Sequence, residues 1–170
     1  MIKFYGRKYP QYRFLSNFHV AIFTLQGHQW PSVENFYQAM KSLDPEVQAT
    51  IREAETPGKA KKLGQACEVR ADWEDPVGTP HMHAIFTDPQ GIVVHSVKDH
   101  FMFQALTMKF TQRKELRDAL LLTADEELVE DSPTDLYWGI GKDGTGLNKL
   151  GRMLQLVRAQ LPNRWNPKAL

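Results

Sequence analysis

The residues with the clearest capacity for chemistry lie in one short segment, residues 30–41. The segment predicts a helix that begins after Ser32, because a serine hydroxyl at the N-cap accepts a hydrogen bond from an otherwise unpaired backbone N–H. Glu34, Gln38 and Lys41 follow at steps of four and three residues, so they share one stripe of that helix. Glu34 and Lys41 lie about 10 Å apart along the axis. That separation is too long for an ideal ion pair but suits two groups that grip one ribose-sized molecule.

A second stripe of the same helix is apolar. Val33, Phe36, Met40 and Leu43 recur at three- and four-residue steps and predict the face that packs on the core. The helix dipole favours the ionised form of Glu34 in the first turn. A solvated face on an ordinary amphipathic helix has the same polar spacing, so the spacing alone does not separate a catalytic stripe from a solvated one.

Length and composition are those of an ordinary globular domain. The chain has 170 residues, of which 42% are hydrophobic and 24% charged. Its net charge of +1 excludes a global basic field, so any contact with DNA must be local. Cys67 is the only cysteine, so an intramolecular disulfide is excluded and the cytoplasm is the expected location. The sequence shows no signal peptide and no apolar run of about 20 residues, so no membrane contact is expected.

Local patterns predict a mostly helical chain with a few short strands. Strands are expected at residues 2–5, 20–25 and 128–130, and helices from 33, at 45–55, 57–67, 96–110 and 112–122, and from 146. Prolines and glycines in residues 74–92 predict a long loop with a small hairpin near 88–91. The predicted fold class is α+β, mostly α. It is a compact single domain over residues 1–165 with a minor short-stranded sheet, and a tail follows at 166–170.

A glycine-rich segment, residues 139–146, formally matches the dinucleotide fingerprint G-x-G-x-x-G. A Rossmann site is excluded, because no good strand precedes the segment and no acidic residue follows about 20 positions later. A loop that leads into a helix still offers backbone N–H groups to an anion, which makes Gly139 and Gly141 candidate phosphate ligands. The alternative is a plain surface turn.

The histidines give no convincing metal site. His81 and His83 form an H-x-H pair in the predicted loop, and His95 and His100 lie downstream. The sequence assigns them no carboxylate partner, so neither a metal nor another cofactor is expected.

Two tryptophans flank the segments described above. Trp30 opens the polar helical segment, and Trp138 precedes the glycine loop. An indole ring can stack on a nucleobase, with about 1–3 kcal/mol for each stack. Core packing is the alternative for both rings, as it is for Trp73 and Trp165.

Seven short segments together resemble the NADAR (YbiA-like) domain family over nearly the whole chain. In chain order they are residues 4–6; 15–18; 30–34 with 38, 39 and 41; 109–110; 128–130; 135 with 138, 139 and 141; and 148 with 150 and 151. Each is weak alone, but their order and spacing are specific. The departures are Asn35, where the family often has a histidine, and a loop at 74–92 that is longer than in the riboflavin-type members.

The resemblance implies a compact, mainly helical N-glycosidase, which cuts a bond between ribose and nitrogen. Its two substrate classes are phosphoribosylated pyrimidine intermediates of riboflavin biosynthesis and ADP-ribose on guanine bases, where the domain reverses DarT-type toxins. The longer loop argues against the first class, because an added wall changes what the pocket admits. The expected partner is therefore an ADP-ribosylated nucleobase or a phosphoribosyl small molecule, with local DNA contact and a toxin-system partner as further expectations.

Cleavage of an N-ribosyl bond builds positive charge on the sugar, so it calls for a nearby carboxylate and a nucleophile. Glu34 is the predicted carboxylate, and Lys41 is the predicted nucleophile if burial lowers its pKa. The resemblance implies that a lysine at this position forms a Schiff base with the opened ribose. Asp135 is predicted to orient a sugar hydroxyl or a water.

Further residues are predicted to bind the substrate, in addition to Glu34, Lys41 and Asp135. They are Asn17 and Asn148 for the ribose or base edge, Trp30 and Trp138 for the base, Arg7, Gly139 and Gly141 for phosphate, and Phe18 beside Asn17. A module that binds ADP-ribose without turnover needs the same pocket but not Glu34 and Lys41 together. A purely structural helical domain leaves the two-stripe helix unexplained.

Overall fold

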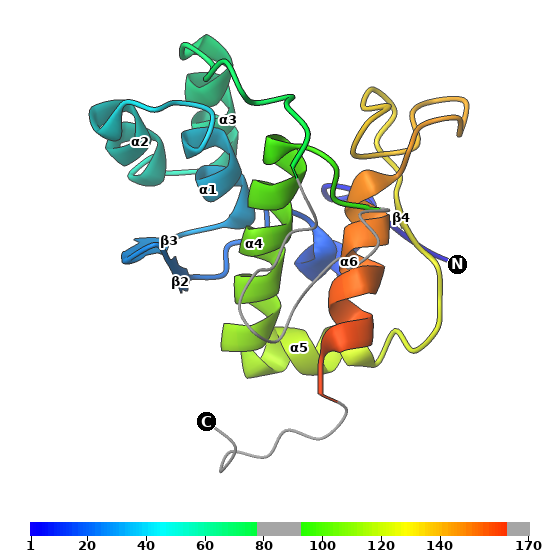
Figure 1. Cartoon of the computed structure of the whole chain (residues 1–170). Helices are drawn as coiled ribbons and strands as arrows, with labels where there is room; N and C mark the ends of the chain where they lie inside the picture. The colour runs from blue at the N-terminus through cyan, green and yellow to red at the C-terminus, as the bar shows by residue number, and fades with distance from the viewer. Residues whose placement is uncertain (78–92, 163–170) are drawn as a thin grey trace.

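Capping side chains set where three of the helices begin. In the computed structural model, the side chains of Ser32, Asp44 and Thr56 each accept a backbone N–H from the first turn of the helix that follows. The structure describes residues 1–77 and 93–162 (Figure 1). The helices in these ranges are η1 (Pro10–Leu15), α1 (Val33–Ala39), α2 (Pro45–Arg52), α3 (Pro57–Ala66), α4 (Val97–Gln112), α5 (Lys114–Leu121) and α6 (Lys149–Gln160).

The strands form two separate sheets. They are β1 (Ile2–Phe4), β2 (Phe23–Leu25), β3 (His28–Trp30) and β4 (Leu128–Glu130). β1 pairs in parallel with β4, while β2 and β3 form an antiparallel hairpin. The hairpin turn has positive φ at Gln26 (54°) and Gly27 (76°), the geometry of a two-residue turn that matches strand twist. The sequence predicted β1 and β4, and its expected strand at 20–25 contains β2. It missed β3, where Trp30 is apolar but His28 and Gln29 are polar.

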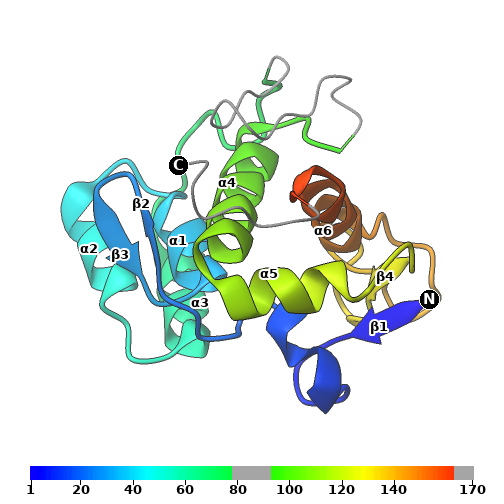
Figure 2. The ribbon, with the colours of Figure 1, turned by 90° about the horizontal axis from the view of Figure 1, so that it is seen from below.

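α4 forms the centre of the fold. Its residues from Met102 to Phe110 are buried except for Gln104, since α1, α5 and α6 pack around it. α4 and α6 run side by side, α1–α3 cluster on one flank, and β1 and β4 lie on the other (Figures 1 and 2). One hydrophobic core extends from Phe4 to Leu161. The predicted fold class, a mostly helical single domain with a minor sheet, is confirmed.

α1 is buried on every side. All of its residues, Val33–Ala39, are buried because α2, α3 and α4 pack against it. The solvated-face alternative is therefore wrong, since Glu34 and Gln38 are 5% and 4% exposed. The predicted apolar stripe also ends early, because Leu43 lies beyond the helix and is 68% exposed.

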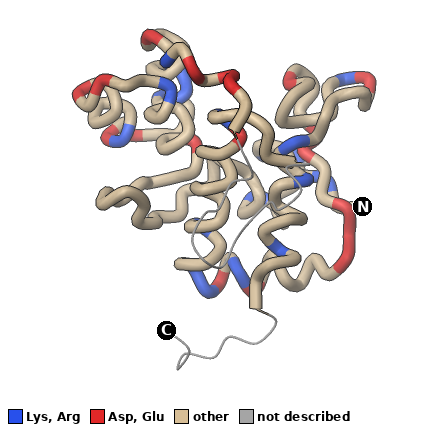
Figure 3. Tube along the Cα trace, viewed as in Figure 1, with Lys and Arg blue, Asp and Glu red and all other residues tan. Residues whose placement is uncertain are grey.

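Some predicted features lie outside the described ranges. One is the part of the predicted loop at residues 78–92, which includes the hairpin expected at 88–91. The other is residues 163–170, which include Trp165, the predicted end of the domain at 165 and the predicted tail at 166–170. A bridge between Pro76 and Ser96 joins the described ends of that loop. Within the described ranges, no helix has the length and apolar character to cross a bilayer. Acidic and basic residues are interspersed along the chain, in keeping with its net charge of +1 (Figure 3).

Candidate active site

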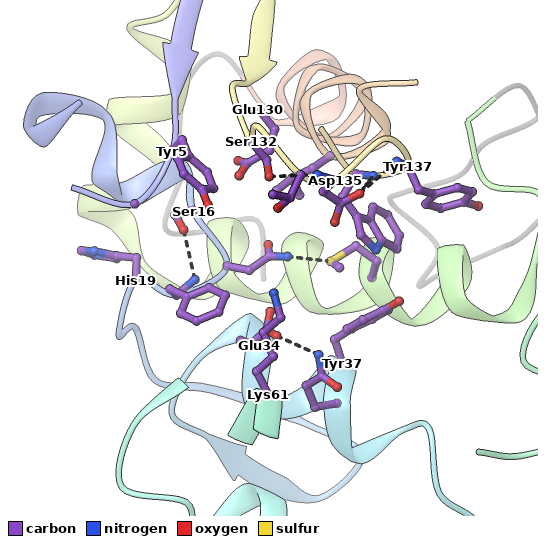
Figure 4. A pocket seen from close by; sticks show the side chains of 18 of the residues that line it. Tyr5, Ser16, His19, Glu34, Tyr37, Lys61, Glu130, Ser132, Asp135 and Tyr137 are labelled. Atoms are coloured by element: carbon purple, nitrogen blue, oxygen red, sulfur yellow. Dashed lines mark hydrogen bonds between the residues drawn. The ribbon is translucent and has the colours of Figure 1, made fainter. Parts of the chain in front are cut away.

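A pocket of about 940 Å³ lies where four parts of the chain meet (Figure 4). Its walls come from residues 5–19, from α1 and the lysine after it, from α3, and from the loop after β4. Glu130 of β4, Met102 of α4 and Leu150 of α6 complete the lining. Seven of the predicted site residues line it: Arg7, Asn17, Phe18, Glu34, Lys41, Asp135 and Trp138. The structure therefore brings together residues that are far apart in the sequence.

Glu34 is held in the wall of the pocket. Its Oε1 accepts a hydrogen bond from the Gln38 amide at 2.8 Å. Its backbone N–H donates to the Asn17 carbonyl at 3.2 Å, which ties α1 to the segment before it. Burial raises the pKa of Glu34 above its ordinary value, while Gln38, Lys61 and Lys41 oppose the rise. A carboxylate that is shielded from water acts strongly on a charge that develops beside it.

α3 approaches Gln38 closely because it has a glycine at the contact. A Cβ added at Gly64 would lie 2.2 Å from Gln38 Oε1 and 2.7 Å from Gln38 Cβ. Any larger residue would displace the glutamine. Gly64 therefore leaves room for the Gln38 side chain in the position from which it holds Glu34.

Lys41 follows α1 and is half-buried at the pocket. Its Nζ lies 5.7 Å from the centroid of the Tyr37 ring. Burial lowers the pKa of the Lys41 amine, against the opposing effect of Glu34, and so favours the neutral, nucleophilic form. α3 adds a second amine, Lys61, whose Nζ lies 5.7 Å from the centroid of the Phe18 ring. The sequence analysis missed Lys61, because no local pattern connects α3 with α1.

Asp135 shapes the loop that carries Trp138. Its Oδ1 accepts the backbone N–H groups of Tyr137 at 2.9 Å and of Trp138 at 2.7 Å. The Trp138 ring packs edge-on against Tyr37, with 5.5 Å between centroids. Because Oδ1 is engaged in the turn, Oδ2 is the atom of Asp135 that is left for a substrate.

Glu130 also lines the pocket, and the sequence analysis gave it no role. It ends β4 and is 9% exposed. Its Oε2 is buried without a hydrogen-bond partner among the described residues. Burial, together with Asp135, Asp131 and Glu34, raises the pKa of Glu130 to about 8, and Lys61 opposes this rise. The signal that could have found it is a carboxylate at the end of an apolar strand, where the charged form is poorly solvated.

A buried lysine supports the segment that carries Asn17 and Phe18. Lys109 of α4 is fully buried, and its Nζ donates to the Ser16 carbonyl at 3.0 Å. Burial lowers the pKa of Lys109 to about 7. Asn17 Nδ2 contacts Met102 Sδ at 3.3 Å, and its Oδ1 is buried without a partner in the described part of the chain. Asn17 thus offers a polar group to the pocket, and Phe18 offers an aromatic one.

Trp30 does not belong to the site. It is 1% exposed, its indole N–H donates to the Leu25 carbonyl at 3.0 Å, and its ring packs edge-on against Phe36 at 5.0 Å. The prediction that Trp30 stacks on a base is wrong, because the core encloses the ring. Trp73 is likewise buried and packs against Tyr37 and Phe101.

The glycine loop forms a close-packed turn before α6. The backbone N–H groups that precede and open α6 are already engaged: those of residues 146–150 donate to carbonyls of residues 136–140. This is also why α6 begins at residue 149 and not at 146 as predicted. Gly139 is needed for close packing, since a Cβ there would lie 2.8 Å from the Glu130 carbonyl oxygen, and Gly141 for its φ of 68°. Neither glycine lines the pocket, so their role as phosphate ligands remains a prediction.

Asn148 is likewise a structural residue. Its Oδ1 accepts the Glu130 N–H at 3.0 Å, and its Nδ2 donates to the Leu128 carbonyl at 2.9 Å. Both polar atoms of its side chain therefore hold β4, and the residue does not line the pocket. The prediction that Asn148 contacts the ribose or base is wrong.

The described histidines are not placed to form a metal site. Within the described ranges, no group of three or more His, Cys, Asp or Glu side chains is placed to hold an ion. His81 and His83 lie outside those ranges. His100 contacts the Gln104 amide at 3.1 Å through its ring, and burial lowers its pKa.

Comparison with known proteins adds a family and a set of relatives. The family model of the NADAR domain matches residues 3–162. N-glycosidase YbiA of Escherichia coli (strain K12) is 35% identical over 163 residues, which cover 95% of this chain and 88% of that protein. An N-glycosidase of Nostoc punctiforme is 33% identical over 168 residues, which cover 96% and 94%.

Two further comparisons concern a longer protein and a solved structure. A riboflavin biosynthesis protein of Vibrio vulnificus is 35% identical over 150 residues, which cover 87% of this chain but 35% of that protein. The NMR structure of Escherichia coli YbiA aligns with a TM-score of 0.72 at 34% identity, covering 94% of this chain and 83% of that one. The fold and the sequence therefore lead to the same group of proteins.

Proposed function

This chain belongs to the NADAR domain family, and we propose that it removes ADP-ribose from guanine bases by hydrolysing the N-glycosyl bond. It is a hydrolase that acts on N-glycosyl compounds, like the relatives that are named N-glycosidases. The choice of ADP-ribose rests on the pocket. Its volume of about 940 Å³ is at the upper end for small-molecule sites, so a single ribose phosphate would fill only part of it.

The charges of the pocket fit a diphosphate. Arg7, Arg13 and Lys61 line it, and none of the three makes an ion pair within the described ranges. Guanidinium groups bind phosphate oxygens through paired N–H donors, and lysine adds a compact positive charge. An ADP-ribosyl group carries two phosphates and a second nucleoside, which would use both these cations and the remaining volume.

In the proposed reaction, Lys41 and Glu34 act on the sugar. The neutral Nζ of Lys41 attacks the anomeric carbon, and the bond to the base nitrogen breaks with its electron pair going to that nitrogen. Glu34 stabilises the positive charge on the ribose as the bond lengthens. Nζ then loses a proton and the ribose ring of the adduct opens, which gives the Schiff base. Water hydrolyses this Schiff base, which releases the sugar and restores the amine. Asp135 Oδ2 orients a sugar hydroxyl or the water, while Phe18 and Trp138 contact the base.

A second substrate class is supported by the similarity to the Vibrio protein. That relative is named for riboflavin biosynthesis, and its similarity to this chain favours a phosphoribosylated pyrimidine as the alternative substrate. This chain spans about a third of that protein's length. A binding module for ADP-ribose without turnover is the other alternative, and it would not need a buried amine beside a buried carboxylate.

Parallel incubation tests the proposal. The protein is mixed with guanine-ADP-ribosylated DNA and, separately, with the phosphoribosylated pyrimidine intermediate, and released sugar is followed by mass spectrometry. We expect free ADP-ribose from the DNA and restored guanine. Release from the pyrimidine alone would transfer the assignment to the riboflavin-type substrate. Tight binding of ADP-ribose with no release from either substrate would make the protein a binding module.

A further inference from the structure

One carboxyl group in the pocket is not used by the reaction described above. Glu130 lies at the end of β4, on the same side of the pocket as Ser132 and Asp135, and faces the side formed by Glu34 and Lys61 (Figure 4). Glu34 and Lys41, which act on the anomeric carbon, come from α1 and the residues that follow it. Glu130 therefore stands on the opposite wall from them.

The backbone fixes Glu130 firmly. Its N–H donates to Asn148 Oδ1 at 3.0 Å, its carbonyl accepts the Ile140 N–H at 3.0 Å, and the next N–H, that of Asp131, donates to the Phe4 carbonyl at 3.0 Å. The side chain carries no such support, because Oε2 is buried without a donor among the described residues. At Oε2 an ionised carboxylate would lack both solvation and a hydrogen-bond donor, whereas a protonated carboxyl group has a donor of its own.

The charged groups around Glu130 act in the same direction. Asp131 and Asp135 from the loop after β4 and Glu34 from α1 all disfavour its ionisation, and Lys61 from α3 opposes them. Residues 5–7 also line the pocket and add the Tyr5 hydroxyl and the Arg7 guanidinium. Burial is the largest cause, and together these effects place the pKa of Glu130 at about 8. Glu130 therefore holds a proton at neutral pH.

We propose that Glu130 is the general acid that protonates the departing base. This inference rests on the proposed function and adds the group that acts on the base rather than on the sugar. As the bond between the anomeric carbon and the base nitrogen breaks, its electron pair stays on the nitrogen and the Glu130 carboxyl group transfers its proton there. The water that later releases the sugar supplies the hydroxyl, and a proton from it returns to the Glu130 carboxylate. One water is consumed, and the enzyme is restored.

The sharpest test measures how kcat depends on the leaving base in the wild-type protein and in Glu130→Gln. Glu130→Gln keeps the shape of the side chain but has no acidic proton, and we expect kcat on ADP-ribosylated guanine to fall by about 10² or more. Methylation of the same substrate at guanine N7 places a positive charge on the ring, so the base can leave without taking a proton. On that substrate the loss should shrink to less than about tenfold. In the wild-type protein, kcat/KM should fall above pH 8, and Glu130→Gln should lack this limb.

Asp131→Asn is the matched control. Asp131 is the adjacent carboxylate, but Lys8 Nζ and the Tyr9 hydroxyl both lie at 2.6 Å from its Oδ2, and it does not line the pocket. We expect this variant to keep kcat within about twofold and to keep an alkaline limb, moved to lower pH because the Asp131 charge that disfavours ionisation of Glu130 is removed. Circular dichroism confirms that each variant is folded.

Infrared spectroscopy detects whether the Glu130 carboxyl group is protonated, and it needs no substrate. A carboxylic C=O band should disappear as the wild-type protein is titrated from pH 6 to pH 10, and Glu130→Gln should lack this change. Absence of the band in the wild-type protein, or equal losses of rate on the methylated and unmethylated substrates, would overturn the inference. If the wild-type protein does not act on ADP-ribosylated guanine, the proposed function fails instead, and the pH profile of Glu130→Gln is then measured with the phosphoribosylated pyrimidine.

Discussion

The side-chain amide of Gln38 donates a hydrogen bond to Glu34 Oε1 at 2.8 Å, one helical turn away in a buried part of α1. This bond fixes the carboxylate and leaves its second oxygen for the pocket. It also lowers the pKa of Glu34 and so opposes the larger effect of burial. The pair therefore presents an oriented carboxylate that is poorly solvated, which is the arrangement that stabilises a developing positive charge.

Glu34→Gln tests this arrangement directly. The substitution keeps the size of the side chain and removes its charge. We expect the variant to fold and to bind ADP-ribose, while kcat falls by about 10² or more, because the charge matters most in the transition state. Steady-state kinetics and calorimetric binding measure the two effects. Glu46→Gln, at an exposed position in the first turn of α2, is the control and should change neither. Equal losses of binding and rate would make Glu34 a substrate-holding residue.

Lys41→Ala should abolish nearly all turnover without unfolding the protein, because the side chain is only half-buried and lies outside the core. Borohydride added during turnover should trap a sugar adduct on the wild-type protein and none on this variant. Lys61→Ala, which removes the neighbouring amine, should still give the adduct. A Lys41→Ala protein with more than about a tenth of the wild-type rate, a loss below about 1.4 kcal/mol, would exclude this lysine as the nucleophile.

The lowered pKa of Lys41 predicts a pH dependence on the acid side of the profile. The amine attacks only when it is neutral, so kcat/KM should rise with pH until the lowered pKa is passed. Below that pKa the protonated fraction grows and the rate falls. Borohydride trapping at a series of pH values should follow the same curve. A trapping yield that does not change with pH on the acid side would contradict this assignment.

Gly64→Ala should reduce activity through Gln38. The new Cβ would meet Gln38 Oε1 at 2.2 Å, so the glutamine must move and Glu34 loses its hydrogen-bond donor. We expect at least a tenfold loss in kcat and a destabilisation of about 1–3 kcal/mol by denaturant unfolding. Gly58→Ala, on the same helix, places its Cβ no closer than 3.9 Å to another atom and should leave activity unchanged. Similar kinetics for the two variants would show that Gln38 does not hold Glu34 in place.

Glu130→Gln should change how stability depends on pH. Folding raises the pKa of Glu130 from 4.5 to about 8, so the folded state binds the proton more tightly. The wild-type protein therefore loses stability as pH rises from about 5 to 8. The variant should gain about 2 kcal/mol relative to wild type by pH 9, less than the upper bound set by about 1.4 kcal/mol for each pKa unit. Urea unfolding at pH 5 and pH 9 measures this gain, which should be near zero at the lower pH.

Asp131→Asn should change the pH dependence of stability in the opposite direction. Hydrogen bonds from Lys8 and Tyr9 lower the pKa of Asp131 to about 2. Its stabilising effect is therefore present above the unfolded pKa of 3.8 and is lost as pH falls toward 2. The same urea series, extended to acid pH, should show a destabilised variant near neutrality and a shrinking difference in acid.

Turnover should not need a metal. The site contains an amine and carboxylates that suffice for the proposed chemistry, and no metal-binding cluster occurs among the described residues. We expect EDTA treatment to leave kcat unchanged. Loss of activity in chelator that one divalent ion restores would contradict this and return attention to His81 and His83.

The sequence alone determined the local structure. Ser32, Asp44 and Thr56 mark helix starts, because a capping hydroxyl or carboxylate needs only the N–H groups of the next turn. The stripe of Glu34, Gln38 and Lys41 follows from helical geometry alone. These features depend on neighbours within a few residues, which a sequence displays directly.

Only the tertiary structure decided which of these residues face the pocket and which are buried elsewhere. Trp30 has the surroundings of a binding residue in the sequence, yet it lies in the core, and Asn148 holds β4 instead of a ligand. The local signal of Glu130, a carboxylate at the end of an apolar strand, assigns it no role, and it becomes a candidate acid because β4 ends beside Asp135 and across from Glu34. Burial and long-range electrostatics arise from packing among distant segments, so the pKa values of this site are properties of the fold and not of any one segment.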